Sequence, residues 1–111
     1  MEQQITPIEG GLYVTTSEKP FHILKVLKFE DDIVHIALYK NRFDEIPAKV
    51  DGSSLLFGTI NDKDGFGIGH LPLSYDEFVG WKPQFLQHSL VLPDELDGYQ
   101  MWKESGGGVW R

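Results

Sequence analysis

The stretch FHILKVLKFEDDIVHIALYK, residues 21–40, decides the fold, because it contains two strand-like runs separated by an acidic triplet at residues 30–32. Both runs are rich in aliphatic and β-branched side chains, which favour strands, whereas aspartates favour turns. The pattern therefore predicts a β-hairpin. Pairing Phe29 with Ile33 leaves residues 30–32 as a three-residue loop and keeps facing side chains on a common side of the sheet.

That register predicts a hairpin with two apolar faces. One face carries Leu24, Val26, Val34, Ile36 and Leu38. The other carries Ile23, Leu27, Phe29, Ile33, Ala37 and Tyr39. Strands that are apolar on both faces are typical of the covered centre of a sheet, so we expect other elements to pack on each side.

Four further strands are predicted from aliphatic and aromatic runs bounded by turn residues, at residues 12–16, 55–60, 67–71 and 85–92. The second and third of these form another hairpin around the turn-rich NDKDG of residues 61–65. Glycines within that hairpin indicate a bulge or the close approach of another backbone.

Two helices are predicted in the second half of the chain. Ser74 precedes Glu77 by three residues, the spacing of a capping box, which predicts a short helix near residues 74–81. Pro93-Asp94-Glu95 has the proline and acids of a helix start and predicts a C-terminal helix near residues 94–104. We expect this helix to dock on the sheet through Leu92, Leu96, Tyr99 and Trp102.

These elements predict a single domain, residues 1–111, of the α+β class. Its mainly antiparallel sheet should contain about five or six strands and form a curved sheet or an open barrel. Residues 1–10 are polar and should form a loose N-terminal arm. Residues 106–111 should form a flexible glycine-rich tail that carries the apolar pair Val109-Trp110.

The absence of cysteine excludes disulfides, thiolate metal sites and a thiol nucleophile. The first residues, MEQQITPIEGG, lack the basic and apolar segments of a secretory signal. No apolar run approaches the roughly 20 residues that cross a bilayer. We therefore expect a cytoplasmic protein without membrane contact.

Acidic residues outnumber basic ones by 17 to 10, which gives a formal net charge of −7. Such a charge repels nucleic-acid phosphates and anionic lipids, and it attracts a basic protein or a cationic ligand. We therefore do not expect nucleic-acid binding, and a basic protein is the expected partner. The alternative is that the charge only keeps a small protein soluble.

Four histidines, at positions 22, 35, 70 and 88, are isolated in the sequence and form no metal-binding or catalytic motif. His70 is the strongest candidate, because it follows the glycine-rich GFGIG of residues 65–69, where small residues leave space beside it. The glycine spacing does not fit a phosphate-binding loop, and the NDKDG turn lacks the acidic ligands of an EF-hand. We expect neither a metal nor a cofactor.

The densest mixture of aromatic, cationic and anionic groups is YKNRFDEIP, residues 39–47, which we expect in a long surface connection after the hairpin. Tyr39 offers a stacking face and Arg42 a bidentate donor for a carboxylate or phosphate. Asp44 and Glu45 can accept from a basic partner. The alternative is that Arg42 pairs with one of these acids and only stiffens the connection.

Three functions fit this sequence. The first is a small binding module, of an inhibitor or immunity type, that recognises a basic protein surface through residues 39–47 and the acidic hairpin tips. We favour binding over catalysis because no nucleophile motif is present. The second is a small-molecule or enzyme site, with His70 as acid or base, Arg42 as anion clamp and Asp44 as orienting carboxylate. The third is a structural subunit that forms homodimers through an edge strand or the apolar C-terminal pair.

Overall fold

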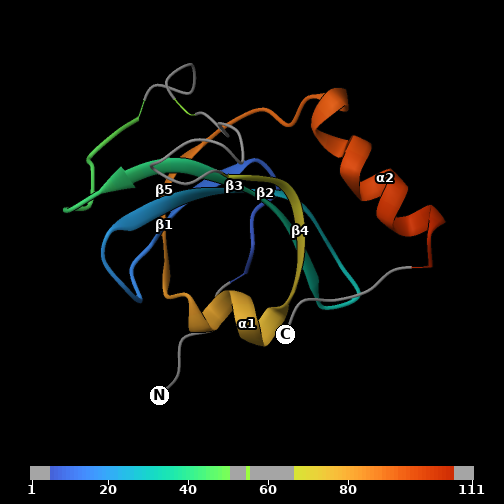
Figure 1. The fold of residues 1–111 in the computed structure, drawn as a ribbon, viewed down its shortest axis with the longest axis horizontal. Coiled ribbons are helices and arrows are strands. Elements are labelled where there is room, and N and C mark those ends of the chain that lie inside the picture. Colours follow the sequence, from blue (N-terminus) through green and yellow to red (C-terminus); the bar gives the residue numbers. More distant parts are fainter. Residues whose placement is uncertain (1–5, 51–54, 56–66, 107–111) are drawn as a thin grey trace.

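The computed structural model describes residues 6–50, 55 and 67–106, and within them five strands form one antiparallel sheet. The strands are β1 (Gly11–Thr15), β2 (Phe21–Glu30), β3 (Ile33–Phe43), β4 (Ile68–Ser74) and β5 (Pro83–His88). Their order across the sheet is β4-β3-β2-β1-β5. The sheet is twisted and does not close, so β4 and β5 are its edges (Figure 1). The predicted α+β class with a mainly antiparallel sheet is confirmed.

The tip of the β2–β3 hairpin differs from the predicted three-residue loop. Glu30 pairs with Ile33, so the loop contains only Asp31 and Asp32. Both aspartates have positive φ, 55° and 60°, as the central residues of a type I′ turn do. This turn matches the right-handed twist of the strands that it joins, and aspartate tolerates the left-handed region better than most residues. The loop predicted at residues 30–32 is therefore wrong.

The register predicted further along the hairpin is correct in its middle, but at the open end Phe21 pairs with Phe43, two residues away from the predicted partner. Leu24 pairs with Leu38 and Val26 with Ile36. An irregularity between Val26 and Lys28 inserts one extra residue into β2 and joins this register to that of the turn. Apolar alternation specifies the register where one face of a strand is apolar and the other is polar. Both faces of β2 are apolar here, so the pattern does not locate the bulge.

Both faces of the sheet are buried, as predicted. The first, here called the strap face, carries the buried residues Leu12, Val14, Ile23, Leu27, Ala37, Tyr39 and Val50. The second, the α1 face, carries Tyr13, Leu24, Val26, Val34, Ile36, Leu73 and Phe78. Phe29 packs on the α1 face and not beside Leu27 as predicted, because the bulge reverses the side to which it points.

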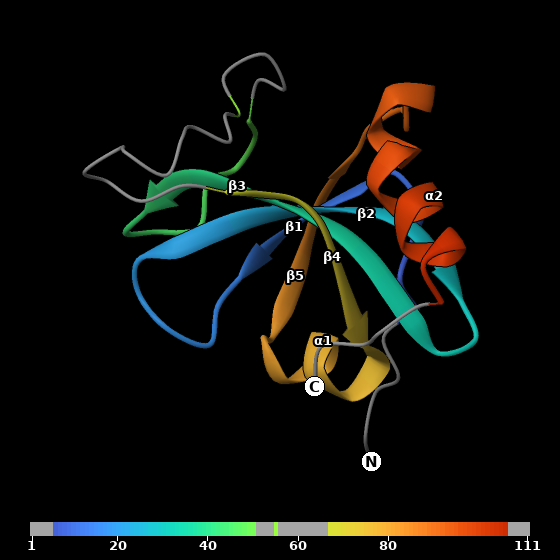
Figure 2. The ribbon, with the colours of Figure 1, turned by 45° about the vertical axis from the view of Figure 1, so that its right-hand side comes forward.

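A helix covers one face of the sheet and a C-terminal strap covers the other (Figure 2). The helix is α1 (Tyr75–Gly80). The strap is residues 89–104, which include the 3-10 turn η2 (Pro93–Leu96) and the helix α2 (Asp97–Glu104). The helices predicted near residues 74–81 and 94–104 are therefore both present.

Ser74 caps α1 and forms the serine half of the predicted capping box. Its hydroxyl accepts a hydrogen bond from the Glu77 backbone N–H at 3.2 Å. The Glu77 carboxylate in turn accepts from the indole N–H of Trp81 at 2.9 Å, which ties the end of the helix to its first turn. Lys82 follows with a φ of 51°, a left-handed residue that ends the helix and leads into β5.

The strand predicted at residues 85–92 lies earlier in the chain, at Pro83–His88. After His88 the chain leaves the sheet edge and crosses the strap face, where the Leu90 carbonyl accepts a hydrogen bond from Lys25 Nζ at 2.6 Å. The first arm of the second predicted hairpin, residues 55–60, lies outside the described residues except for Leu55. Its second arm lies within β4.

Gly10, at the end of the predicted N-terminal arm, is bound to the sheet on both sides. Its N–H donates to the Val26 carbonyl and its carbonyl accepts from the Ser89 N–H, each at 2.7 Å. Its φ is 85°, and a Cβ there would lie 2.1 Å from the Ser89 carbonyl oxygen, so only glycine fits. Residues 1–5 of the predicted arm and 107–111 of the predicted tail lie outside the described residues.

Candidate functional site

Two histidines stack beneath helix α2 on the strap face. His35 of β3 is fully buried, and its Nδ1 lies 2.9 Å from Nε2 of His70 in β4. The rings are 5.1 Å apart and nearly parallel, at 14°. Tyr99 and Trp102 of α2 contact the His35 ring edge-on, with centroids at 4.8 and 4.5 Å. The pair is therefore enclosed by two strands and the helix.

The hydrogen bonding of His35 favours one placement of the protons on the two rings. Its Nε2 is buried without a partner. A buried N–H without an acceptor is rarer in proteins than an unused lone pair, so Nε2 carries the lone pair and the Nδ1–H of His35 donates to His70 Nε2. His70 then has its own proton on Nδ1. Burial, with a smaller contribution from His70, lowers the pKa of His35 to about 4, and burial also lowers the pKa of His70, so both rings are neutral near pH 7.

Tyr99 anchors α2 to the end of β2. Its hydroxyl donates a short hydrogen bond to Oε1 of Glu30. This bond lowers the pKa of the Glu30 carboxyl group and raises the pKa of the Tyr99 hydroxyl. The ammonium groups of Lys28 and Lys103 lie 5.5 and 5.8 Å from the centre of the tyrosine ring, within cation–π range.

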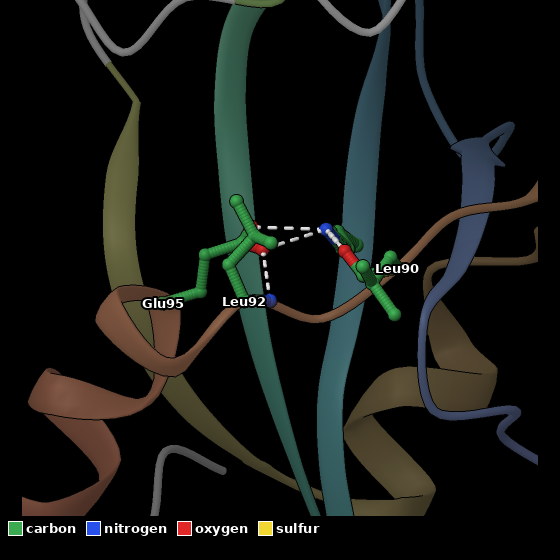
Figure 3. A network of polar contacts seen from close by, with 4 residues as sticks. Leu90, Leu92 and Glu95 are labelled. Atoms are coloured by element: carbon green, nitrogen blue, oxygen red, sulfur yellow. Dashed lines mark hydrogen bonds and ion pairs between the residues drawn. The ribbon is translucent and has the colours of Figure 1, made fainter.

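A buried ion pair fixes the start of the strap, as the dashed lines of Figure 3 show. Lys25 is 4% exposed, and its Nζ donates to both carboxylate oxygens of Glu95, at 2.8 and 3.0 Å, and to the Leu90 carbonyl. Glu95 also accepts from the Leu92 N–H at 2.8 Å. Burial and the nearby Glu95 charge raise the pKa of Tyr39 to about 12. The polar groups at this position are thus paired with each other.

A cavity of about 420 Å³, here called the His70 hollow, lies where the strap meets β3 and β4. It is lined by Ala37, Gly69, His70, Asp94, Glu95 and Gly98. Gly98 lets the helix approach closely, because a Cβ at this position would lie 2.5 Å from the Cβ of His70. The volume is within the range of small-molecule sites, and His70 Nδ1–H is a donor beside it.

A larger concave surface of about 670 Å³, here called the acidic hollow, lies between the β2–β3 turn and the start of α1. Its lining residues are Asp31, Asp32, Ile33, Ser74, Tyr75, Asp76 and Glu77. The Tyr75 N–H donates to the Asp32 carbonyl at 2.9 Å, so the turn and the helix are held together. Four of these seven residues are acidic and none is basic. The Glu77 carboxylate also accepts a hydrogen bond from Trp81.

The sequence segment 39–47 is not a loop at its start, because β3 continues to Phe43. Arg42 is exposed on this strand, and Asp44 and Glu45 are exposed just after it. Among the described residues, no ion pair joins Arg42 to either acid. The ion pair that these residues do form joins Lys25 to Glu95, on the strap face.

His70 lies apart from Arg42, Asp44 and Glu45, whereas the buried Tyr39 is two residues from Ala37 on the same face. β4 pairs with the first half of β3, which places His70 beside Ala37. Arg42 is five residues further along β3, but a register shift places it opposite His22, only three residues of β2 from the partner of Ala37. Three residues span about 10 Å at the usual strand rise. Asp44 lies beyond it. The structure therefore does not bring Arg42, Asp44 and His70 into one cavity, and His70 contacts His35 instead.

Sequence reasoning missed the buried polar contacts of Lys25, His35 and Glu95 on the strap face. It predicted Tyr99 and Trp102 as docking residues of the helix, but not their contacts with His35. A signal was nevertheless present. The predicted register places Lys25 and His35 on the same side as Ala37, on a face that had to be covered. A polar side chain on a covered face needs a buried partner, and only the C-terminal helix was available to supply one.

A scan against protein-family models finds no match, and searches of curated proteins and of solved structures find none either. Within residues 6–50, 55 and 67–106, no helix has the length and hydrophobicity to cross a membrane. The same residues contain no group of three or more histidines and carboxylates placed to hold a metal ion. Fold and surface thus define a small α+β domain whose open antiparallel sheet has a strap on one face and an acidic hollow at one end.

Proposed function

We propose that this protein is a non-catalytic binding module, of an inhibitor or immunity type, that recognises a basic surface of a partner protein through the acidic hollow. The observation that carries the proposal is that four acidic residues, Asp31, Asp32, Asp76 and Glu77, line one concave surface together with no basic residue. Lysine or arginine side chains entering it would form charge-assisted hydrogen bonds. The net charge of −7 would accelerate their approach.

The elements that carry these carboxylates are well fixed. Asp31 and Asp32 are held by the tight turn and by the bond from Tyr75, and α1 is held by the Ser74 cap. Binding groups fixed before association lose little conformational entropy on binding. The exposed acids Asp44 and Glu45 follow the far end of the 11-residue strand β3, about 35 Å from the turn at the usual strand rise. They can therefore serve as a control for net charge.

Affinity for a fluorescent octalysine peptide tests this proposal, with anisotropy measured at low and at high salt. The variant D31N/D32N removes two charges and preserves the turn, because asparagine also tolerates the left-handed region. It should weaken binding at least about fivefold, or about 1 kcal/mol. The matched variant D44N/E45Q removes the same charge elsewhere and should change the affinity less than about twofold. Equal loss in the two variants would show that only net charge attracts the peptide.

A second function, binding of a small molecule in the His70 hollow, is favoured by the cavity and the donor that His70 presents to it. Arg42 and Asp44 have no part in this version. Asp94 is exposed and lines the hollow, so Asp94→Lys should repel a protonated amine from it without disturbing the core. Binding of small aromatic amines, detected through the His70 ring signals in NMR spectra, should disappear in this variant. Amines that bind the variant equally well would exclude the hollow as their site.

A further inference from the structure

The strands at the two edges of the sheet carry no charged residue. Residues 83–93, PQFLQHSLVLP, include β5 and contain no Asp, Glu, Lys or Arg, and the same is true of residues 65–75, which include β4. Charges lie instead on the inner strands, at positions such as Lys28 and Arg42. Soluble proteins usually show the opposite pattern, because charges on an edge strand prevent pairing with another chain.

Strand β5 has an outer side that no other strand covers in the described part of the chain, where its only strand partner is β1. Gln84, Phe85 and His88 are exposed on β5. Phe85 is 51% exposed although its ring contacts Tyr13 edge-on at 5.5 Å. Backbone N–H and C=O groups along such an edge can form a ladder with a further strand. We do not extend this reasoning to the edge formed by β4, because residues 56–66, which precede β4, lie outside the described residues.

We propose that β5 is a dimerisation edge that pairs antiparallel with β5 of a second copy of this chain and extends the sheet across a two-fold axis. In a two-fold interface each surface meets its own copy, so any charge near the axis faces a like charge. Each copy has a net charge of −7, and the uncharged edge at residues 83–93 is where two such copies can approach without direct repulsion. A basic partner would gain no attraction from this edge, which selects a second copy as its occupant.

The ladder across the axis is short. Pro83 has no N–H to donate, and a register shift between Leu12 and Tyr13 of β1 distorts β5 between Phe85 and Gln87. A short ladder with a few exposed side chains buries little area, so we expect a dimer that dissociates in the micromolar range or above. Because both copies are acidic, added salt should screen their repulsion and strengthen the dimer. Binding of a basic partner at the acidic hollow should weaken with salt, so the two proposals can fail independently.

Sedimentation velocity of the full chain over a range of concentrations, at low and high salt, tests the proposal. The wild-type protein should approach twice the 12.6 kDa chain mass as concentration or salt increases. The variant Q84K/H88K places lysines on the edge and should remain monomeric, although it lowers the overall negative charge. The control Q100K/M101K adds the same charge at exposed positions of α2 and should dimerise at least as well as wild type.

Three results would overturn the dimer: a wild-type monomer at every concentration and salt, a dimer that persists in Q84K/H88K, or one lost equally in the control. Far-ultraviolet circular dichroism checks that both variants are folded, which is expected because all four substituted side chains are exposed. The salt dependence of dimerisation can be measured on the wild-type protein alone. A dimer that weakens as salt is added would by itself contradict an interface without charges.

Discussion

At the scale of single residues, Lys25 and Glu95 show how one buried pair can place a long segment. Within the part of the chain that the structure describes, the Lys25 ammonium group donates its hydrogen bonds to the strap, to Glu95 and to the Leu90 carbonyl. A buried charge that loses its partner is costly, whereas a buried pair contributes little net stability compared with apolar residues of similar volume. The pair therefore specifies where the strap docks more than it adds to the free energy of folding.

The two substitutions of this pair should differ in their effects. Glu95→Gln leaves the buried Lys25 ammonium without a counter-charge and should lower the free energy of unfolding by about 3 kcal/mol. Lys25→Met fills the volume of the lysine stem and leaves a carboxylate that is 24% exposed, so it should cost less than about 1.5 kcal/mol. Urea denaturation measures both. Equal losses would mean that the pair is not desolvated in solution.

His35 should make the stability of the protein depend on pH. Its pKa is about 4 in the folded protein and 6.5 in an unfolded chain, so between these values the unfolded state binds more protons. Its contribution is therefore complete above pH 6.5 and is lost as the pH falls toward 4. The full loss corresponds to about 3 kcal/mol.

Urea denaturation at pH 7 and pH 5 measures this effect. The wild-type protein should be less stable at pH 5, and His35→Phe, which keeps an aromatic ring against Tyr99 and Trp102, should lose much of the difference. His88→Gln removes an exposed histidine and should behave as wild type. A pH dependence that survives unchanged in His35→Phe would show that His35 is not the group responsible.

At the scale of elements, the clearest sequence signals were those with local physical causes. The Ser74 capping box predicted α1, and the alternation of Leu24, Val26, Val34 and Ile36 predicted the hairpin register. The bulge after Val26 could not be predicted, because both faces of β2 are apolar and a shift of one residue leaves the pattern almost unchanged. The strap was predicted as a helix, but its path depends on the Lys25 pair, a contact between residues far apart in the sequence.

The type I′ turn predicts a specific response at Asp32, whose φ is 60°. Asp32→Asn and Asp32→Val remove the same charge, but valine is strained in the left-handed region because of its branched Cβ. The valine variant should therefore be less stable than the asparagine variant by more than about 1 kcal/mol. Thermal unfolding compares the two. Equal stabilities would instead support a wider loop such as the one expected at residues 30–32.

The Ser74 cap predicts a loss of stability when its hydroxyl is removed. Ser74→Ala leaves the Glu77 N–H without its acceptor and should lower the free energy of unfolding by about 1 kcal/mol. Ser74→Asp keeps an acceptor at the cap and should retain most of the stability. Urea denaturation of the two variants is sufficient. If alanine were as stable as aspartate at this position, the cap would contribute nothing.

At the scale of the whole molecule, the strap face is internally paired and the acidic hollow faces outward. The buried polar groups of the strap face bond mainly to each other, as Lys25 and Glu95 and the two stacked histidines show. The carboxylates of the acidic hollow surround an open surface. The sequence suggested an acidic hairpin tip as a binding element, but it could not show that α1 would bring two further acids beside it. That proximity depends on the pairing of β4 with β3.

The most direct test of the proposed binding function is a map of the backbone amides that respond to octalysine, obtained from nitrogen-15-labelled protein by NMR. The largest shifts should fall at residues 31–33 and 74–77, and they should fade as salt is added. Residues 44 and 45 should respond weakly, although both are acidic and exposed. Shifts concentrated at residues 94–98 or 44–45, or spread evenly over all acidic residues, would contradict recognition by the acidic hollow.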